Sequence, residues 1–184
     1  GIITGAIVTD TDEYSYYEPN GTSFDDTITN NGVWNTENAS NRFGAGTDIL
    51  TNVGTINAAN AYFLGLDSFV NNGTLSLANT AATDWLITTG SLTLNADSQV
   101  VLDISGYSAD HVYTYGDLEI DGGSLIVNQV GPRAKPGIFY LLGGTKVMPD
   151  MVANGLLGYT VERIWGDNRY ETNLQILRKA GVTC

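Results

Sequence analysis

The chain has 184 residues and a formal net charge of −12, from 20 Asp and Glu against 8 Lys and Arg. This balance argues against nucleic acid or anionic lipid as partners, because both carry negative charge. Only 15% of the residues are charged, and Gly contributes 22 residues. With Asn, Thr and Ser supplying most of the polarity, the composition disfavours long helices and favours short strands joined by turns within one domain.

The first residues carry no targeting or membrane signal. The opening GIITGAIVTD has neither a basic flank nor a full apolar region, so it does not resemble a signal peptide. No stretch approaches the ~20 consecutive apolar residues that span a bilayer, which predicts no membrane insertion. We expect the sequence to begin inside a larger protein or directly after processing. Cys184 is the only cysteine and the last residue, which excludes an internal disulfide.

Residues 9–26, TDTDEYSYYEPNGTSFDD, combine acidic and aromatic side chains. The rings of Tyr14, Tyr16 and Tyr17 are amphipathic and rigid, so an exposed arrangement would suit contact with a partner. We favour the alternative, an irregular coil that packs these rings on the end of the fold.

A recurring motif predicts the architecture. An Asn- or Gly-containing turn followed by a short alternating run occurs five times, as NNGVWN (30–35), NVGTIN (52–57), NNGTLS (71–76), TGSLTL (89–94) and YGDLEI (115–120). The glycines of these motifs are 22, 19, 17 and 26 residues apart. A repeat of about 20 residues that varies by insertion is typical of one coil of a β-solenoid. An antiparallel sandwich is the alternative, but it predicts hairpin turns rather than one motif returning in register.

Residues 33–88 hold the middle coils of this repeat. Burying an aliphatic side chain contributes about 1.5–3 kcal/mol, so a stack of such side chains would dominate the stability. The side chains expected to point inward are Ile49, Leu50, Val53, Ile56, Phe63, Leu64, Leu66, Phe69, Val70, Leu75 and Leu77. Asparagine tolerates left-handed backbone angles and bonds its own backbone, so we expect it at the corners. The residues concerned are Asn30, Asn31, Asn52, Asn71 and Asn72.

Residues 90–127 show the clearest alternation of apolar and polar side chains. Short runs at 91–95, 99–104, 117–120 and 124–127 predict strands that bury one face. Together with one later residue, the expected core here is Leu92, Leu94, Val101, Ile104, Leu118, Ile120, Leu125, Val127 and Leu141.

The character of the sequence changes after Val127. NQVGPRAKPG (128–137) predicts a loop, and IFYLLGG (138–144) predicts a buried strand. YTVERIW (159–165) and NLQILRK (173–179) predict a hairpin across GDN at 166–168. A distinct terminal segment is expected, because the open end of a solenoid must be covered.

These residues carry a resemblance to a known family. GSLTLNADSQVVLDISGYSADHVYTYGDLEIDGGSLIVNQV, followed by PGIFYLLGG, resembles the C-terminal passenger region of bacterial autotransporters, the type V secretion family. The family pattern is a strand, D-S-x-x-x-x-D/E, then S/A-D-x-[LV]-x-x-G-x-[LV]-x-[LI]-x-G-G-x-[LV]-x-V and a closing G-x-Y-x-L-[LI]. The matching residues are Asp97, Ser98, Ala109, Asp110, His111, Val112, Gly116, Asp117, Leu118, Gly122, Gly123, Ser124, Leu125, Val127, Gly137, Phe139, Tyr140, Leu141 and Leu142. The match spans residues 90–144 and extends more loosely upstream.

The resemblance implies an all-β fold, a right-handed parallel β-helix (solenoid) with a C-terminal cap or β-hairpin. It divides one continuous domain into N-terminal β-helix coils (1–88), autochaperone-like core coils (89–145) and a C-terminal cap or hairpin (146–184). In the family, the autochaperone core emerges first and templates the folding of later coils. The implied partners are the protein's own C-terminal outer-membrane β-barrel, which is absent from this sequence, and host surface or matrix molecules.

The function that the resemblance implies is structural and adhesive. We expect a passenger module displayed on the extracellular side of the outer membrane of a Gram-negative bacterium, its C-terminal part promoting folding and secretion, with no enzyme activity. The alternative is a carbohydrate-active β-helix enzyme or a polysaccharide depolymerase fragment. That alternative needs an acid cluster facing one groove together with Arg or Lys. A third and weaker alternative is a β-sandwich binding domain.

The residues that could carry chemistry are few. His111, the single histidine, would serve a hydrolytic triad only beside a nucleophile and an orienting acid, and no nucleophile motif of the G-D-S-G type occurs. We expect His111 to be structural. Asn20, Asn38 and Asn72 begin N-x-[ST] sequences, which arise by composition in an Asn- and Thr-rich chain.

Two groups of acids are the remaining candidates for a site. They are Asp25–Asp26 and the group Asp10, Asp12 and Glu13, and the nearest arginine to either is Arg42. Residues 10–13 are rich in oxygen ligands but lack the glycine-spaced geometry of a calcium loop. We therefore expect solvated loop charge, with no catalytic residue, no metal ligand and no cofactor.

Overall fold

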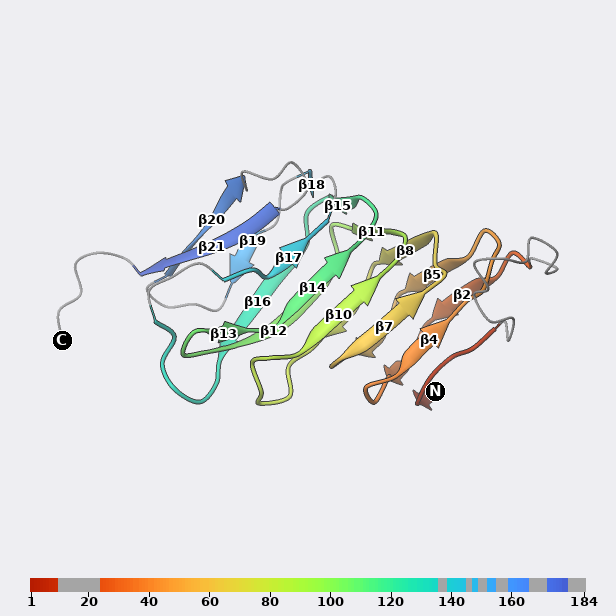
Figure 1. The fold of residues 1–184 in the computed structure, drawn as a ribbon, viewed down its shortest axis with the longest axis horizontal. Coiled ribbons are helices and arrows are strands. Elements are labelled where there is room, and N and C mark those ends of the chain that lie inside the picture. Colours follow the sequence, from red (N-terminus) through yellow and green to blue (C-terminus); the bar gives the residue numbers. More distant parts are fainter. Residues whose placement is uncertain are drawn as a thin grey trace, which may run out of the picture.

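The computed structural model describes residues 1–9, 24–135, 139–144, 147–148, 152–154, 159–165 and 172–178, with side chains in the first three of these ranges. Within these residues the fold is all-β, a long stack of short strands (Figure 1). The described part contains no helix that is long and apolar enough to cross a membrane.

Three sheets form the solenoid, and two terminal strands form a fourth, two-stranded sheet. Sheet A contains β1 (Ile2–Thr4), β3 (Val33–Asn35), β6 (Thr55–Asn57), β9 (Thr74–Ser76), β12 (Gln99–Ser105), β16 (Ser124–Gln129) and β19 (Val152–Asn154), with β13 (Ser108–Ala109) paired to β12. Sheet B contains β4 (Ser40–Arg42), β7 (Ala61–Leu64), β10 (Trp85–Thr88), β14 (His111–Thr114) and β17 (Leu142–Gly143). Sheet C contains β2 (Thr27–Asn30), β5 (Ile49–Asn52), β8 (Ser68–Asn71), β11 (Ser91–Leu94), β15 (Leu118–Ile120) and β18 (Val147–Met148).

From β2 onward the chain visits sheets C, A and B in the same order in each coil. Each strand pairs in parallel with its equivalent one coil later, as β5 does with β8 and β8 with β11. Among the described strands, antiparallel pairing occurs only between β12 and β13 and in the terminal hairpin. The fold is therefore the parallel β-solenoid that the repeat predicts, and the β-sandwich alternative is wrong.

Inward side chains stack into columns along the solenoid. In sheet A, successive registers place Trp34, Ile56, Leu75, Val100 and Leu125 one above another, all buried. In sheet C, the equivalent column is Leu50, Phe69, Leu92 and Leu118. A single coil is too thin to bury its own apolar face, so each column exists only because its neighbours cover it.

Most of the predicted core residues are buried, and the exceptions that lie within strands have a common reason. Val101 was expected in the core but is half-buried, while Val100 and Leu102 on either side are fully buried. Val53 lies between β5 and β6 and is 51% exposed. A strand directs successive side chains to opposite faces, so adjacent apolar residues cannot both point inward. The same rule leaves Ile49, Leu64 and Val70 half-buried beside buried neighbours.

The five glycine motifs prove to mark two different corners. Gly32, Gly54 and Gly73 follow the strands of sheet C, whereas Gly90 and Gly116 precede them. The single spacing series predicted from the sequence is therefore wrong, because its step of 17 joins one corner to the other. At the first corner, a Cβ on Gly54 would overlap the carbonyl oxygen of Gly32, and one on Gly73 would overlap that of Gly54. The coils approach too closely here for any side chain.

The corner asparagines bond the local backbone as expected, since Asn30 and Asn71 donate from Nδ2 to the carbonyls of Gly32 and Gly73, but none of the five has a left-handed backbone angle. The non-glycine residues with positive φ in the described chain are Glu37, Asn38, Asn60 and Thr80. Asn30, Asn52 and Asn71 are buried, and each is the last residue of a sheet C strand. Asn30 Nδ2 donates to Asn52 Oδ1 at 2.8 Å, and Asn52 Nδ2 donates to Asn71 Oδ1 at 2.7 Å. The amides form a ladder because each lies one coil above the last.

The two paired strands of the predicted terminal hairpin are confirmed, and its predicted turn at 166–168 lies outside the described residues. β20 (Tyr159–Trp165) pairs antiparallel with β21 (Thr172–Arg178), and β21 lies against β17 at the C-terminal end of the solenoid (Figure 1). Tyr14, Tyr16 and Tyr17 lie outside the described residues. The division at residues 88 and 145 stays a prediction.

The glycine corner gives a first test. Gly54→Ala should lower the free energy of unfolding by about 3 kcal/mol or more, because the new methyl group overlaps the backbone of the previous coil. Denaturant unfolding followed by circular dichroism measures the loss. Gly106→Ala is the matched control, since Gly106 has φ +57° but open space around it, and should cost only about 1 kcal/mol. Equal losses would contradict the stacked corner.

The inward register gives a second test. Leu118→Asp places an unpaired charge in the buried sheet C column and should destabilise the fold by about 3–5 kcal/mol. Val53→Asp adds the same charge at an exposed position and should change stability by no more than about 0.5 kcal/mol. A denaturation midpoint of Leu118→Asp equal to that of the unmodified chain would refute the register.

Candidate functional site

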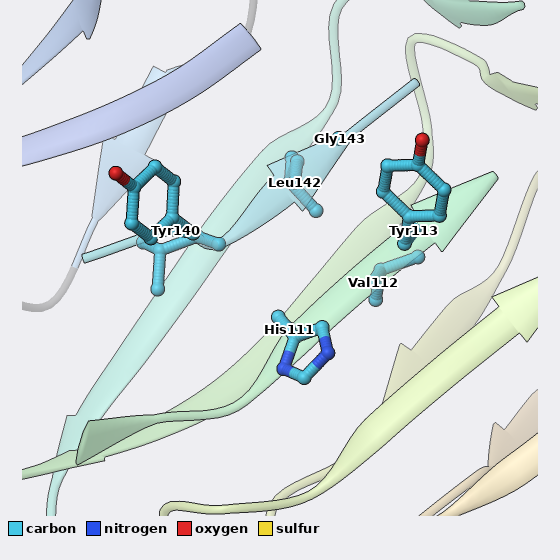
Figure 2. A pocket seen from close by; sticks show the side chains of 7 residues that line it. His111, Val112, Tyr113, Tyr140, Leu142 and Gly143 are labelled. Carbon is cyan, nitrogen blue, oxygen red and sulfur yellow. The ribbon is translucent and has the colours of Figure 1, made fainter. Parts of the chain in front are cut away.

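A concave feature of the described surface lies on the outer face of sheet B, next to His111. A pocket of about 250 Å³ opens there, lined by three residues of β14 and by residues 140–143. Figure 2 shows the rings of Tyr140 and Tyr113 on either side of Leu142, with the imidazole of His111 close by. Pairing of β14 with β17 brings these two segments together.

Two aromatic rings define this pocket. Tyr140 is 58% exposed, and Tyr113 is half-buried with its ring edge against Tyr115, at 5.3 Å between ring centroids. Gly143 pairs with Tyr113 across the sheet, and a Cβ on Gly143 would lie 2.8 Å from Cδ2 of that ring. The absence of a side chain at Gly143 therefore lets the Tyr113 ring lie over β17.

His111 offers the pocket a neutral imidazole. Burial lowers the pKa of His111 below its usual value of 6.5, so the ring is uncharged at pH 7. No hydrogen bond joins the imidazole to another described side chain, and the backbone N–H of His111 donates to the Asp84 carbonyl at 3.0 Å. The structural role expected for His111 stays a prediction.

The aromatic character continues onto the neighbouring strands. Trp85 on β10 is the register partner of His111, and its ring lies 4.4 Å from that of Tyr62 on β7. Ile87 lies between Tyr62 and Tyr113 in the same register. We call Tyr62, Trp85, Ile87, His111, Tyr113 and Tyr140 the aromatic face. The sequence analysis missed it, because these residues become neighbours only when the coils stack.

A second feature is a buried acid cluster formed by Asp84, Asp103 and Asp110. The two carboxylate oxygens of Asp110 accept the backbone N–H groups of Asp84, at 2.9 Å, and Asp103, at 2.8 Å. Asp103 in turn accepts the N–H groups of Asn79 and Thr80 and the amide of Asn128. Asn60 donates to one oxygen of Asp84, and the other oxygen is buried without a partner among the described residues. The cluster ties neighbouring coils together.

The environment of Asp110 makes its carboxylate hard to ionise. Burial, opposed by the two backbone hydrogen bonds and reinforced by the charges of Asp84 and Asp103, raises the pKa of Asp110 to about 6. His111 is the adjacent titratable residue, and it is neutral for the reason given above. One signal of the cluster was visible in the sequence, since Asp103 interrupts the apolar run of VVLDIS.

A third feature is a ladder of acids at the entrance to sheet C. Asp48 accepts the backbone N–H of Asp26 at 2.9 Å, and Asp67 accepts that of Asp48 at 2.8 Å. Asp25, the other member of the predicted pair, accepts the N–H of Thr47. Burial raises the pKa of Asp48, and its Oδ2 is buried with no hydrogen-bond partner in the part of the chain that the structure describes. These acids bond to backbone amides of adjacent coils.

The predicted candidates form no metal site or ion pair in the described residues. No group of three His, Cys, Asp or Glu side chains there has the geometry to hold a metal ion. Arg42 is exposed on β4, and no salt bridge joins it to Asp25 or Asp26. Asp10, Asp12 and Glu13 lie outside the described residues.

Neither protein-family models nor curated proteins provide a match to this chain. The resemblance to autotransporter passengers therefore stands on the sequence motif alone.

The acid cluster predicts a pH dependence of stability. The pKa of Asp110 is higher in the folded state than its unfolded value of 3.8. Its contribution to the free energy of unfolding therefore increases as the pH falls through about 6, and is lost as the pH rises through that value. Lowering the pH from 7 to 4 should increase this contribution to the free energy of unfolding by an amount on the order of 2 kcal/mol.

Asp110→Asn isolates this effect from the other acids. The variant keeps one acceptor oxygen but cannot titrate, so its unfolding free energy should depend less on pH than that of the unmodified chain. Denaturant unfolding at a series of pH values measures the difference. Parallel pH curves for the two proteins would show that folding does not raise the pKa of Asp110.

Proposed function

We propose that this chain is a structural and adhesive passenger module of a bacterial autotransporter, and that residues 89–145 act as the stable core that promotes its folding and secretion. The proposal places the module on the extracellular side of the outer membrane of a Gram-negative bacterium. It assigns no enzyme activity to the chain. The motif at residues 90–144 and the β-solenoid fold support it together, since the motif resembles that of a family with this architecture.

The observation that carries the folding role is the pairing of β12 with β16. This pair stays in register over six residues, from Gln99 with Ser124 to Ile104 with Gln129, whereas the other described parallel pairs cover two to four residues. Longer pairing adds hydrogen bonds and apolar burial without another loop to close, so it favours early formation.

Side chains strengthen the same region. Gln129 donates from Nε2 to the carbonyls of Ile104 and Pro132, and its Oε1 accepts the N–H of Ala134 at 2.8 Å. These bonds hold the loop after β16 against β12. Asp103 links the segment at Asn79 to Asn128 on β16. The core coils are thus connected by more than the sheet hydrogen bonds.

The interior also changes near residue 89. The sheet C column that begins with Asn30, Asn52 and Asn71 continues in register as Leu94 and Ile120. Replacing amides by aliphatic groups removes buried polar surface from this column. Thr88 and Thr114 follow Phe63 in sheet B, which offsets part of the gain.

The alternative prediction of a carbohydrate-active enzyme or polysaccharide depolymerase requires acids open to a groove beside Arg or Lys. The acids described above instead accept backbone N–H groups between coils. We therefore propose a mechanical role for them.

The test compares unfolding of the whole chain with that of residues 89–184. Guanidinium unfolding, followed by far-UV circular dichroism, should show that the 89–184 fragment unfolds cooperatively. Its midpoint should equal that of the most resistant transition of the whole chain. Residues 1–88 are the control fragment and should not fold alone. If the 89–184 fragment is unfolded and the whole chain unfolds in a single transition, the proposal of a separate stable core is contradicted.

Hydrogen exchange on the whole chain supplies an independent measure. Amides of β12 and β16 should exchange most slowly, because they open only with the most stable unit. Slower exchange in β5 and β8 than in β12 and β16 would contradict the proposal even if the fragment folds.

A further inference from the structure

We propose that the aromatic face of sheet B binds a neutral oligosaccharide, seated in the pocket between Tyr113 and Tyr140 and extending along the solenoid over Trp85 and Tyr62. The inference gives the proposed adhesive function a ligand class, and it rests on that function.

The first argument is the shape and surface of the pocket. The rings of Tyr113 and Tyr140 line the pocket on either side of Leu142, whose own side chain is buried (Figure 2). The faces of a sugar ring carry C–H groups, which pack on aromatic rings, while its rim carries hydroxyl groups. Tyrosine supplies both an apolar ring and a hydroxyl that donates and accepts hydrogen bonds.

The second argument is charge. The described strands of sheet B contain no Asp, Glu or Lys, although the whole chain carries a net charge of −12. Their ionisable side chains, apart from tyrosine, are Arg42 on β4 and His111, whose imidazole is neutral at pH 7. The nearby acids Asp84 and Asp110 are buried. The net negative charge of the chain would repel an anion. The described strands of sheet B have no exposed carboxylate that could bind a cation. The face therefore suits a neutral polar ligand.

The third argument is extension along one axis. β17, β14, β10 and β7 are consecutive neighbours in sheet B, so their outer side chains succeed one another at the strand spacing of about 4.8 Å. The Tyr62–Trp85 pair thus continues the row from the pocket. A chain of sugar units fits such a row of rings better than a single compact ligand.

The fourth argument is that the Tyr113 ring is held in place before binding. Tyr113 lies over Gly143 and packs edge-on against Tyr115, and both strands are fixed by parallel pairing. Ordered rings lose little conformational entropy on binding.

The experiment uses the whole chain and a panel of hexasaccharides. Saturation-transfer NMR and titration calorimetry would be run with cellohexaose, mannohexaose, maltohexaose and chitohexaose, and with hexagalacturonate as the anionic comparator. At least one neutral hexasaccharide should bind at millimolar concentration or below, more tightly than hexagalacturonate. Absence of binding by all four, or tighter binding of hexagalacturonate, overturns the proposal.

Variants locate the site. Tyr140→Ala removes an exposed ring and should weaken binding about tenfold without changing the unfolding midpoint. Tyr107→Ala is the matched control, because Tyr107 is 79% exposed near β13, outside the pocket, and it should leave the dissociation constant unchanged. Gly143→Ala forces the Tyr113 ring to move and should also weaken binding. If Tyr140→Ala and Tyr107→Ala bind the oligosaccharide with equal affinity, the proposed position of the binding site is wrong.

Sedimentation equilibrium distinguishes the competing occupant, a second copy of the chain. If Tyr140→Ala abolishes self-association while glycan binding is absent, the face is a contact between copies and the proposal fails. The folding core is tested by unfolding and exchange, so its failure is separate from a failure here.

Discussion

Stacking of each coil directly on the previous one is the constraint on which the rest of the structure depends. The parallel registers of sheets A, B and C repeat the same path, and the corner glycines allow the backbones to approach within a distance that excludes a Cβ. Once this spacing is set, every inward side chain lies above an equivalent one. Buried columns, the asparagine ladder and the row of outward aromatic rings all follow from the same repetition.

Stacking also explains why so many acids are held at inner positions or corners. A carboxylate at the start of one strand faces the backbone N–H of the coil beside it, so Asp48, Asp67 and Asp110 each accept such bonds. These bonds compensate part of the cost of burying the charge, and the remainder appears as the raised pKa of Asp48 and Asp110. Acids that could have suggested a catalytic groove therefore connect coils instead.

The two functional proposals use different parts of the same scaffold. The folding role depends on the interior of residues 89–145, where β12 and β16 pair over the greatest length. The binding role depends on the outer face of sheet B. There the pairing of β14 with β17 brings Tyr113 and Tyr140 to the two sides of one pocket. A solenoid permits this division because alternate side chains of one strand serve the core and the surface independently.

The sequence by itself determined the all-β class, the stacked repeat, most of the core and the terminal hairpin, because alternation and turn residues act locally. Only the tertiary structure decided which member of each apolar doublet points inward, as with Val100 and Val101. It also separated the two glycine corners and brought Asp84 to Asp110, and Trp85 to His111, across a full coil. Coil lengths vary by insertion, so the residue that lies above another cannot be found by counting along the chain, and contacts between coils depend on that register.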